Sequence, residues 1–216
     1  EDSSHDLRRD DMKFKRMYNI YEIITEVAKT CFIPLTFGGN IKTIEQIKEI
    51  LNKGADKVLV NTIAIDKPSF ITESAKKFGS QCIVVGIDVK LNNKKEYEVY
   101  SEHGKKQTGK DPLIWAQEVE KLGAGEIFLN SIDRDGTSEG YDLELVKSVS
   151  EAVKIPVIAC GGVGVFEHFV EGIKEGKASA VAAGNIFNYT ENSVIRAKKT
   201  LEKAGIPIRK IIKVQN

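Results

Sequence analysis

The chain has 216 residues, 41% of them hydrophobic, and its 32 Lys and Arg residues almost balance its 31 Asp and Glu residues. That hydrophobic fraction is typical of a folded protein and excludes general disorder. A chain of this length buries enough surface for one compact core, so we expect residues 1–216 to form a single domain. The balanced charge offers no broad positive surface, which argues against nucleic acid or an anionic membrane as a partner.

No apolar run approaches the roughly 20 residues that span a bilayer, and no secretory signal pattern opens the chain, so we expect a cytoplasmic protein. The three cysteines, Cys31, Cys82 and Cys160, are odd in number and lie in apolar runs. They share no ligand spacing with the three histidines. This pattern predicts buried, reduced thiols, with neither a metal site nor a cofactor.

Short β-branched runs alternate along the chain with amphipathic stretches of helical length. The predicted strands are Ile33–Phe37, Lys57–Asn61, Cys82–Asp88, Glu126–Asn130, Pro156–Cys160 and Ala178–Ala183. The predicted helices are Ile44–Leu51, Pro68–Phe78, Pro112–Leu122, Leu143–Val153, Phe166–Glu175 and Ser193–Ala204. Several begin at Asp, Thr or Pro and end at Gly, which are typical helix boundaries. Such alternation predicts an α/β fold with parallel strands.

One departure from this alternation follows the strand Cys82–Asp88. There Glu96–Tyr100 alternates in polarity between two turn signals, Asn92-Asn93 and His103-Gly104. We interpret this segment as an inserted hairpin. Because it follows the carboxyl end of a strand, it is either a lid or substrate clamp, or a surface ornament.

An internal repeat relates the two halves of the chain. Ile33-Pro34-Leu35 followed by Gly38-Gly39 recurs about 122 residues later as Ile155-Pro156-Val157 followed by Gly161-Gly162. Twice this period is close to the ~250 residues of a (β/α)8 barrel built from two half-barrels. We therefore predict a (β/α)8 TIM barrel that lacks the first strand and helix and most of the second strand in this chain. Only the end of that second strand would lie near residues 1–4.

Small residues follow two neighbouring strands in the second half, at Gly161-Gly162 and Ala183-Gly184-Asn185. Barrels bind ligands at the carboxyl ends of their strands, and small residues there let backbone N–H groups approach a phosphate. Tight turns without a ligand are the alternative. By the repeat, Gly39-Asn40 and Asn61-Thr62 occupy the equivalent loops of the first half, with amide and hydroxyl donors added. Two related anion sites predict a ligand with two phosphates.

Asp88 follows an otherwise apolar strand, so we expect its carboxylate to face the mouth of the barrel as a general acid or base. A carboxylate that caps the next loop is the alternative. The loop after the following strand contains Asp133, Asp135, Gly136 and Thr137. Its place opposite Asp88 predicts a second carboxylate and further donors for the site.

Lys57 and Glu126 open their strands and therefore belong to the opposite, amino-terminal face of the barrel. From the residues alone, the better interpretation is an ion pair that helps to close the bottom of the barrel.

Several blocks of sequence occur in one order from about Ile33 to Arg209. They are Ile33–Gly39, Gly54–Val58, Phe78–Gln81, Gly123–Ile127, Ser131–Thr137, Gly140–Asp142 and Glu167–Phe169. Together they closely resemble the cyclase subunit family of imidazole glycerol phosphate synthase. This resemblance implies a lyase of histidine biosynthesis that works as a heterodimer with a glutaminase subunit. Ammonia from the glutaminase would convert a phosphoribulosyl-formimino aminoimidazole carboxamide ribotide to imidazole glycerol phosphate and an aminoimidazole carboxamide ribotide.

The resemblance also implies roles for individual residues. Asp88 matches one of two catalytic acid/base carboxylates, and the other ends the first strand, which has no counterpart in this sequence. Lys57 and Glu126 match members of a charged gate for ammonia, and Asp56 matches a residue that faces the glutaminase. The residues that match the phosphate sites are Gly39, Asn61, Thr62, Asp135, Gly136, Gly162, Ala183 and Gly184.

Three positions depart from the family pattern. Asn40 stands where a third glycine is usual, and Cys160 stands where a serine is usual. Gly184-Asn185 stands where the family has the end of a phosphate loop of the alanine-serine type. With these changes, the sequence resembles a paralogous group of cyclase-like proteins that supply ammonia for the amidation of a surface-polysaccharide sugar. The missing first strand raises a third alternative, a catalytically incomplete scaffold for binding and ammonia delivery.

Overall fold

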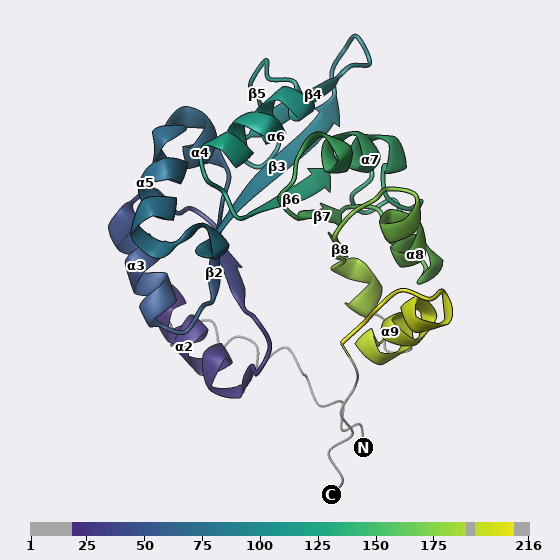
Figure 1. Ribbon diagram of the computed structural model, residues 1–216, viewed down its shortest axis with the longest axis horizontal. Helices are drawn as coiled ribbons and strands as arrows, with labels where there is room; N and C mark the ends of the chain where they lie inside the picture. The colour runs from purple at the N-terminus through teal and green to yellow at the C-terminus, as the bar shows by residue number, and fades with distance from the viewer. Residues whose placement is uncertain (1–18, 189–192, 210–216) are drawn as a thin grey trace, which may run out of the picture. The chain divides into compact units, whose positions relative to one another are not determined.

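The computed structural model describes residues 19–188 and 193–209 (Figure 1). The chain forms two compact units, Glu1–Val58 and Leu59–Asn216, and the division between them falls inside strand β2 (Lys57–Val60). The predicted single domain therefore stays a prediction. The strand end expected near residues 1–4 lies outside the described residues.

The first unit contains a helix that the sequence analysis did not predict. Helix α2 (Ile20–Thr30) begins at Asn19, whose side chain accepts from the Glu22 backbone N–H at 3.1 Å while the Glu22 carboxylate accepts from the Asn19 N–H at 2.9 Å. This reciprocal capping box is a sequence signal of a helix start that was available in the polar opening. Helix α3 (Ile44–Asn52) has the same device at Thr43 and was predicted within one residue.

Strand β1 (Thr36–Gly38) is shorter than the predicted Ile33–Phe37 and lies later in the chain. The backbone before it is bonded to the turn that precedes β2. The Asp56 carboxylate accepts from the Leu35 N–H at 2.7 Å, and the Leu35 carbonyl accepts from the backbone of Asp56 and Lys57. Asp56, predicted to face a glutaminase, thus has a structural contact inside its own unit.

The second unit continues the β/α alternation with the same order of elements that the sequence predicts. Its strands are β3 (Ile83–Leu91), β4 (Tyr97–Ser101), β5 (Lys106–Gln107), β6 (Glu126–Ser131), β7 (Val157–Cys160) and β8 (Ala180–Val181). Its helices are α4 (Thr62–Asp66), α5 (Ser69–Phe78), α6 (Pro112–Lys121), α7 (Leu143–Ala152), α8 (Glu167–Lys174) and α9 (Val194–Lys203), with 3-10 turns η1 (Ser80–Cys82) and η2 (Asn185–Asn188). The short helix α4 was not predicted, and β8 is shorter than expected.

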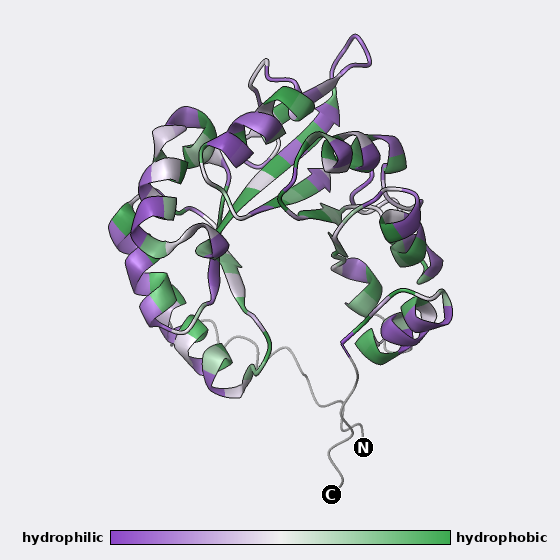
Figure 2. Ribbon diagram, viewed as in Figure 1, coloured by the Kyte–Doolittle hydropathy of each residue, from purple (hydrophilic) through white to green (hydrophobic). Residues whose placement is uncertain are grey.

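Strands β3, β6, β7 and β8 lie side by side in this order and run parallel. Side chains of β3 are almost fully buried from Ile83 to Ile87, and Trp115 of α6 is completely buried. Figure 2 shows that the start of β3 is hydrophobic and that the turn beyond its end is hydrophilic. Burial on both faces is what a parallel sheet flanked by helices requires.

The predicted insertion is confirmed as a hairpin. Strand β3 runs three residues past Asp88, and its end pairs antiparallel with β4, from Asp88 opposite Tyr100 to Leu91 opposite Tyr97. Strand β4 then pairs with β5 across the turn that contains His103 and Gly104. Asp88 therefore lies inside a strand, not at its end as predicted.

The parallel strands and β/α order confirm the predicted fold class, an α/β protein with a partial (β/α)8 barrel. Every helix among the described residues is too short or too polar to cross a membrane. The three cysteines are free, as expected, but each is only partly buried.

Candidate active site

The centre of the candidate site is a row of side chains across three neighbouring strands. In the sheet register, Asp88 of β3 pairs with Asn130 of β6, and Asn130 pairs with Cys160 of β7. Residues paired in this way project from the same face of a parallel sheet. The row therefore places a carboxylate, an amide and a thiol next to one another on one face.

Two amides hold the Asp88 carboxylate. Asn61, which follows β2, donates from Nδ2 to Oδ2 of Asp88 at 2.9 Å, and Asn130 donates from Nδ2 to Oδ1 at 3.2 Å. Burial raises the pKa of Asp88 above its usual range, and these two donors oppose the shift. The charge of His103 in the hairpin also lowers this pKa, and the charge of Asp135 raises it slightly. The site thus holds a carboxyl group that is more basic than an exposed aspartate.

The amides that hold Asp88 leave two buried acceptors without partners. A carboxylate only accepts hydrogen bonds, so both asparagines must turn their NH₂ groups towards it. The Oδ1 atoms of Asn61 and Asn130 are then buried and, among the described residues, have no hydrogen-bond partner. Each such atom costs about 1–3 kcal/mol. The cluster is therefore organised at the expense of stability, as functional sites often are.

We expect Asp88→Asn to raise the melting temperature at pH 7. Because the folded pKa of Asp88 is raised, its contribution to stability is complete below about pH 3.9 and is lost as the pH rises through the folded pKa. A neutral amide at this position escapes that loss, and the usual gain of a stabilising substitution is about 0.5–2 kcal/mol. Thermal unfolding followed by circular dichroism at pH 7 and pH 4 should show a gain that shrinks at the lower pH.

Asp66→Asn, which changes an exposed carboxylate on α4, is the control for this experiment. It should leave the melting temperature nearly unchanged at both pH values. A lower melting temperature for Asp88→Asn at pH 7 would show that the two amide donors outweigh burial, contrary to the direction given above.

Cys160 remains a thiol in this environment. Burial, followed by the negative charge of Asp135, raises the pKa of the Cys160 thiol to about 11. A thiol with such a pKa is a weak nucleophile at neutral pH, because the thiolate is the reactive form. Cys160 therefore contributes shape and weak polarity to the site rather than covalent chemistry.

A small cavity of about 30 Å³ opens beside this row in the second unit. Its lining residues are Asp135, Gly136, Ser138, Cys160, Gly161, Gly162, Val163, Ala183, Gly184 and Asn185. The structure thus brings together the two predicted glycine loops and part of the predicted Asp133–Thr137 loop. Ser138 and Val163 were not predicted as site residues, whereas Asn185 belongs to the predicted Ala183–Asn185 loop.

Only glycine fits at the two positions that follow β7. Gly161 and Gly162 have φ angles of +95° and +99°, in the left-handed region. A Cβ on Gly162 would overlap the carbonyl oxygen of Gly140, and one on Gly161 would lie 2.7 Å from the carbonyl oxygen of Ser131. These close approaches require glycine in the loop after β7, and this loop lines the cavity. A glycine loop at the end of a strand lets backbone N–H groups approach an anion.

The first unit has its own pocket, of about 410 Å³, lined in part by Gly39 and Asn40. Asn40 has a φ of +53°, a conformation that asparagine tolerates better than most residues. This explains physically how asparagine stands where the resembling family has glycine. The remaining lining is largely apolar, with Ile20, Phe37 and Ile41 among its residues.

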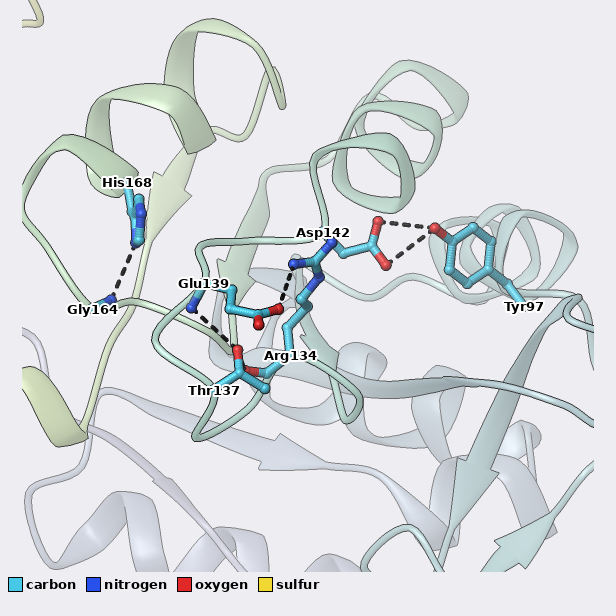
Figure 3. Close-up of polar contacts among 7 residues, drawn as sticks. All are labelled: Tyr97, Arg134, Thr137, Glu139, Asp142, Gly164 and His168. Carbon is cyan, nitrogen blue, oxygen red and sulfur yellow. Dashed lines mark hydrogen bonds and ion pairs between the residues drawn. The ribbon is translucent and has the colours of Figure 1, made fainter.

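Three predicted phosphate ligands have other partners in the structure. The Asn61 amide binds Asp88, and the Thr62 hydroxyl oxygen accepts from the Glu102 N–H of the hairpin at 3.2 Å. The Thr137 hydroxyl donates to the carbonyl oxygen of Arg134 at 2.8 Å, within its own loop (Figure 3). Their assignment to phosphate stays a prediction.

The two carboxylates of the β6–α7 loop (residues 132–142) have different environments. Asp133 accepts from the Leu91 N–H at 2.8 Å and so ties the end of β3 to the loop. Asp135 is exposed and lines the cavity. Of the two, Asp135 is therefore the carboxylate available to the site.

The residues predicted for an ammonia gate open their strands, as expected. Lys57 is the first residue of β2 and Glu126 the first residue of β6, and both are partly buried. In the second unit, Glu126 lies on the same face as Asn130 but four residues earlier. At 3.3 Å per residue, that is about 13 Å towards the amino end of the sheet.

Sequence reasoning missed Asn130 as a partner of Asp88. The signal was the alternation of β6, in which Glu126, Phe128 and Asn130 share one face. Pairing of β6 with β3 also had to be known, because only the register places Asn130 beside Asp88.

Among residues 19–188 and 193–209, no group of three or more His, Cys, Asp or Glu side chains could hold a metal ion. A family model described as "Histidine biosynthesis protein" matches residues 11–193 of the chain. The match covers both glycine loops, Asp88 and the whole β6–α7 loop. The chain therefore belongs to the family of histidine biosynthesis proteins.

Proposed function

We propose that this protein is the cyclase subunit of an imidazole glycerol phosphate synthase. It would use ammonia from a glutaminase partner to convert a phosphoribulosyl-formimino aminoimidazole carboxamide ribotide, which carries two phosphates, to imidazole glycerol phosphate and an aminoimidazole carboxamide ribotide. The observation that carries the proposal is the Asp88 carboxylate, held by two amides next to a glycine-lined cavity. Family membership supports the pathway, and the sequence resemblance supports the cyclase.

The chemistry of Asp88 suits a step that moves a proton on nitrogen. When ammonia forms a new C–N bond, the nitrogen must lose a proton, and a carboxylate of raised pKa is a better acceptor than an ordinary one. The two amide donors keep the carboxylate in one orientation during this transfer. Asp88 is accordingly the general base of the proposed reaction.

The cavity suits a terminal phosphate of the substrate. Its lining offers the backbone of Gly162 and Gly184 to an anion, and Asn185 adds an amide side chain. By the internal repeat, Gly39 and Asn40 stay the candidates for the second phosphate.

Measuring ammonium-driven turnover on the full-length protein with the proposed substrate tests this function directly. Formation of imidazole glycerol phosphate is the expected result. If the protein binds phosphate at Gly162 but gives no product, the surface-sugar alternative gains support. One observation favours that alternative. Cys160, which pairs with Asn130 in the sheet, stands where the cyclase family usually has a serine.

The partner and the gate can be tested in the same assay. We expect Glu126→Gln to reduce turnover with glutamine and a glutaminase subunit by about tenfold or more, while turnover with added ammonium salt stays near the wild-type value. A glutaminase that delivers ammonia through the amino-terminal face would depend on this residue, whereas dissolved ammonia need not pass it. Equal losses in the two assays would refute the gate and support a purely structural ion pair.

A further inference from the structure

We infer that Tyr97 of the inserted hairpin is a positioning residue for the cavity, acting through Asp142 on the two loops that line it. The inference rests on the proposed function in one respect, that the cavity is the phosphate site. The hairpin is then neither an ornament nor a simple lid. It holds the site in shape from one side.

The hairpin contacts the β6–α7 loop at both of its ends. At the start of the loop, Asp133 accepts from the Leu91 N–H at 2.8 Å. At its end, the Tyr97 hydroxyl donates to the Asp142 carboxylate, with its oxygen 2.9 Å from Oδ1 and 3.1 Å from Oδ2 (Figure 3). The segment between these contacts supplies Asp135, Gly136 and Ser138 to the cavity.

Asp142 is also the N-cap of α7. Its Oδ1 accepts from the Leu145 N–H at 3.1 Å, so one carboxylate joins the hairpin to the start of a helix. Hydrogen bonds to a charged acceptor are among the stronger ones in proteins. The Tyr97 hydroxyl keeps its proton throughout the physiological range, because burial and the Asp142 bond raise its pKa.

The two residues before Asp142 carry this contact to the rest of the cavity. The Gly140 N–H donates to the carbonyl oxygen of Gly162 at 2.7 Å, and the Tyr141 hydroxyl donates to the carbonyl oxygen of Ala182 at 3.0 Å. Gly140-Tyr141-Asp142 therefore contacts, in turn, the β7–α8 loop, the end of β8 and the hairpin. A shift of Asp142 would therefore move Gly140, which contacts Gly162, and Tyr141, which contacts the residue before Ala183.

The far side of the β7–α8 loop is held separately. His168 of α8 accepts from the Gly164 N–H at 3.1 Å on Nδ1, as Figure 3 shows. A Cβ on Gly140 would lie 3.3 Å from this imidazole ring, and Gly164 lies against the backbone of Ser138. With one side fixed by α8, the hairpin contact decides how tightly the β6–α7 loop closes on the cavity.

Tyr97→Phe removes the hydroxyl and keeps the ring, and Tyr100→Phe is its matched control. The Tyr100 hydroxyl oxygen accepts from Nε2 of Gln107 at 2.9 Å, a bond that stays inside the hairpin. In ¹⁵N-labelled protein, we expect the Gly140 amide of Tyr97→Phe to exchange its hydrogen about tenfold faster than in the wild type. Inorganic phosphate, titrated against the Gly162 and Gly184 amide shifts, should bind about tenfold more weakly. Tyr100→Phe should change neither value.

Each outcome decides a separate point. Unchanged Gly140 exchange in Tyr97→Phe, or an equal increase in Tyr100→Phe, overturns the inference whether or not phosphate binds. Faster exchange together with wild-type phosphate affinity overturns it too, because a merely structural bond behaves in that way. If wild-type protein binds no phosphate at Gly162 and Gly184, the phosphate site of the proposed function fails, and the positioning role of Tyr97 fails with it. Unchanged Gly140 exchange in a protein that does bind phosphate overturns the inference alone.

Discussion

Replacing Asp88 with asparagine should lower ammonium-driven turnover by a factor of about 10²–10⁴, the usual contribution of a positioned general base. The amide keeps the shape of the side chain between Asn61 and Asn130 but cannot accept the proton. Substrate binding should change little, so the loss should fall on kcat more than on KM. Steady-state kinetics of the full-length protein measure both constants.

Asp133→Asn is the matched control for that variant. It is a carboxylate in the neighbouring loop whose oxygen accepts from the Leu91 N–H, and asparagine retains an acceptor there. Turnover should stay within about threefold of the wild-type value, since this group does no proton transfer in the proposed mechanism. If Asp88→Asn is as active as this control, Asp135 becomes the leading candidate for the base.

The pH dependence gives a second check on Asp88. Because burial raises its pKa, the carboxylate becomes protonated at a higher pH than an exposed aspartate does. The acid limb of the wild-type profile of kcat/KM should therefore lie above about pH 3.9. It should disappear in Asp88→Asn. A limb that survives this substitution belongs to another group.

Gly162→Ala should destabilise the second unit by roughly 2–5 kcal/mol and abolish phosphate binding at the cavity. About 1–2 kcal/mol of this comes from the left-handed φ of +99°, and the rest from a Cβ that would overlap the Gly140 carbonyl oxygen. Relief of the overlap requires the Gly140 contact to open, which separates the two loops that line the cavity. Chemical denaturation and the phosphate titration measure the two effects.

Gly136→Ala separates strain from overlap. Gly136 lines the same cavity with a φ of +80°, but a Cβ there would meet no atom within 4 Å. Its cost should be limited to about 1–2 kcal/mol for the backbone conformation. Similar losses for the two variants would mean that the contact between Gly140 and Gly162 contributes little to the cavity.

By itself, the sequence determined the fold class, the order of most elements and the hairpin. Alternating apolar patterns and turn residues are local properties, so the strand around Asp88 and the insertion around Tyr97 were both readable from neighbours in the chain. Helix α2 also has a local signal, the capping box of Asn19 and Glu22, although it was not among the predicted helices. Small residues after two strands, Gly161-Gly162 and Ala183-Gly184, also predicted the loops that line the cavity, because only residue type and order were needed.

The tertiary structure alone decided which side chains meet. Asn130 lies 42 residues from Asp88 and Asp142 lies 45 residues from Tyr97, so no local pattern links them. The first pair depends on strand register, which moves every side chain to the other face when it shifts by one residue. The burial that raises the pKa of Asp88 likewise depends on segments that are distant from it in the sequence. The sequence predicted the candidate site residues, and packing set the basicity of the Asp88 carboxylate and the contact between Tyr97 and Asp142.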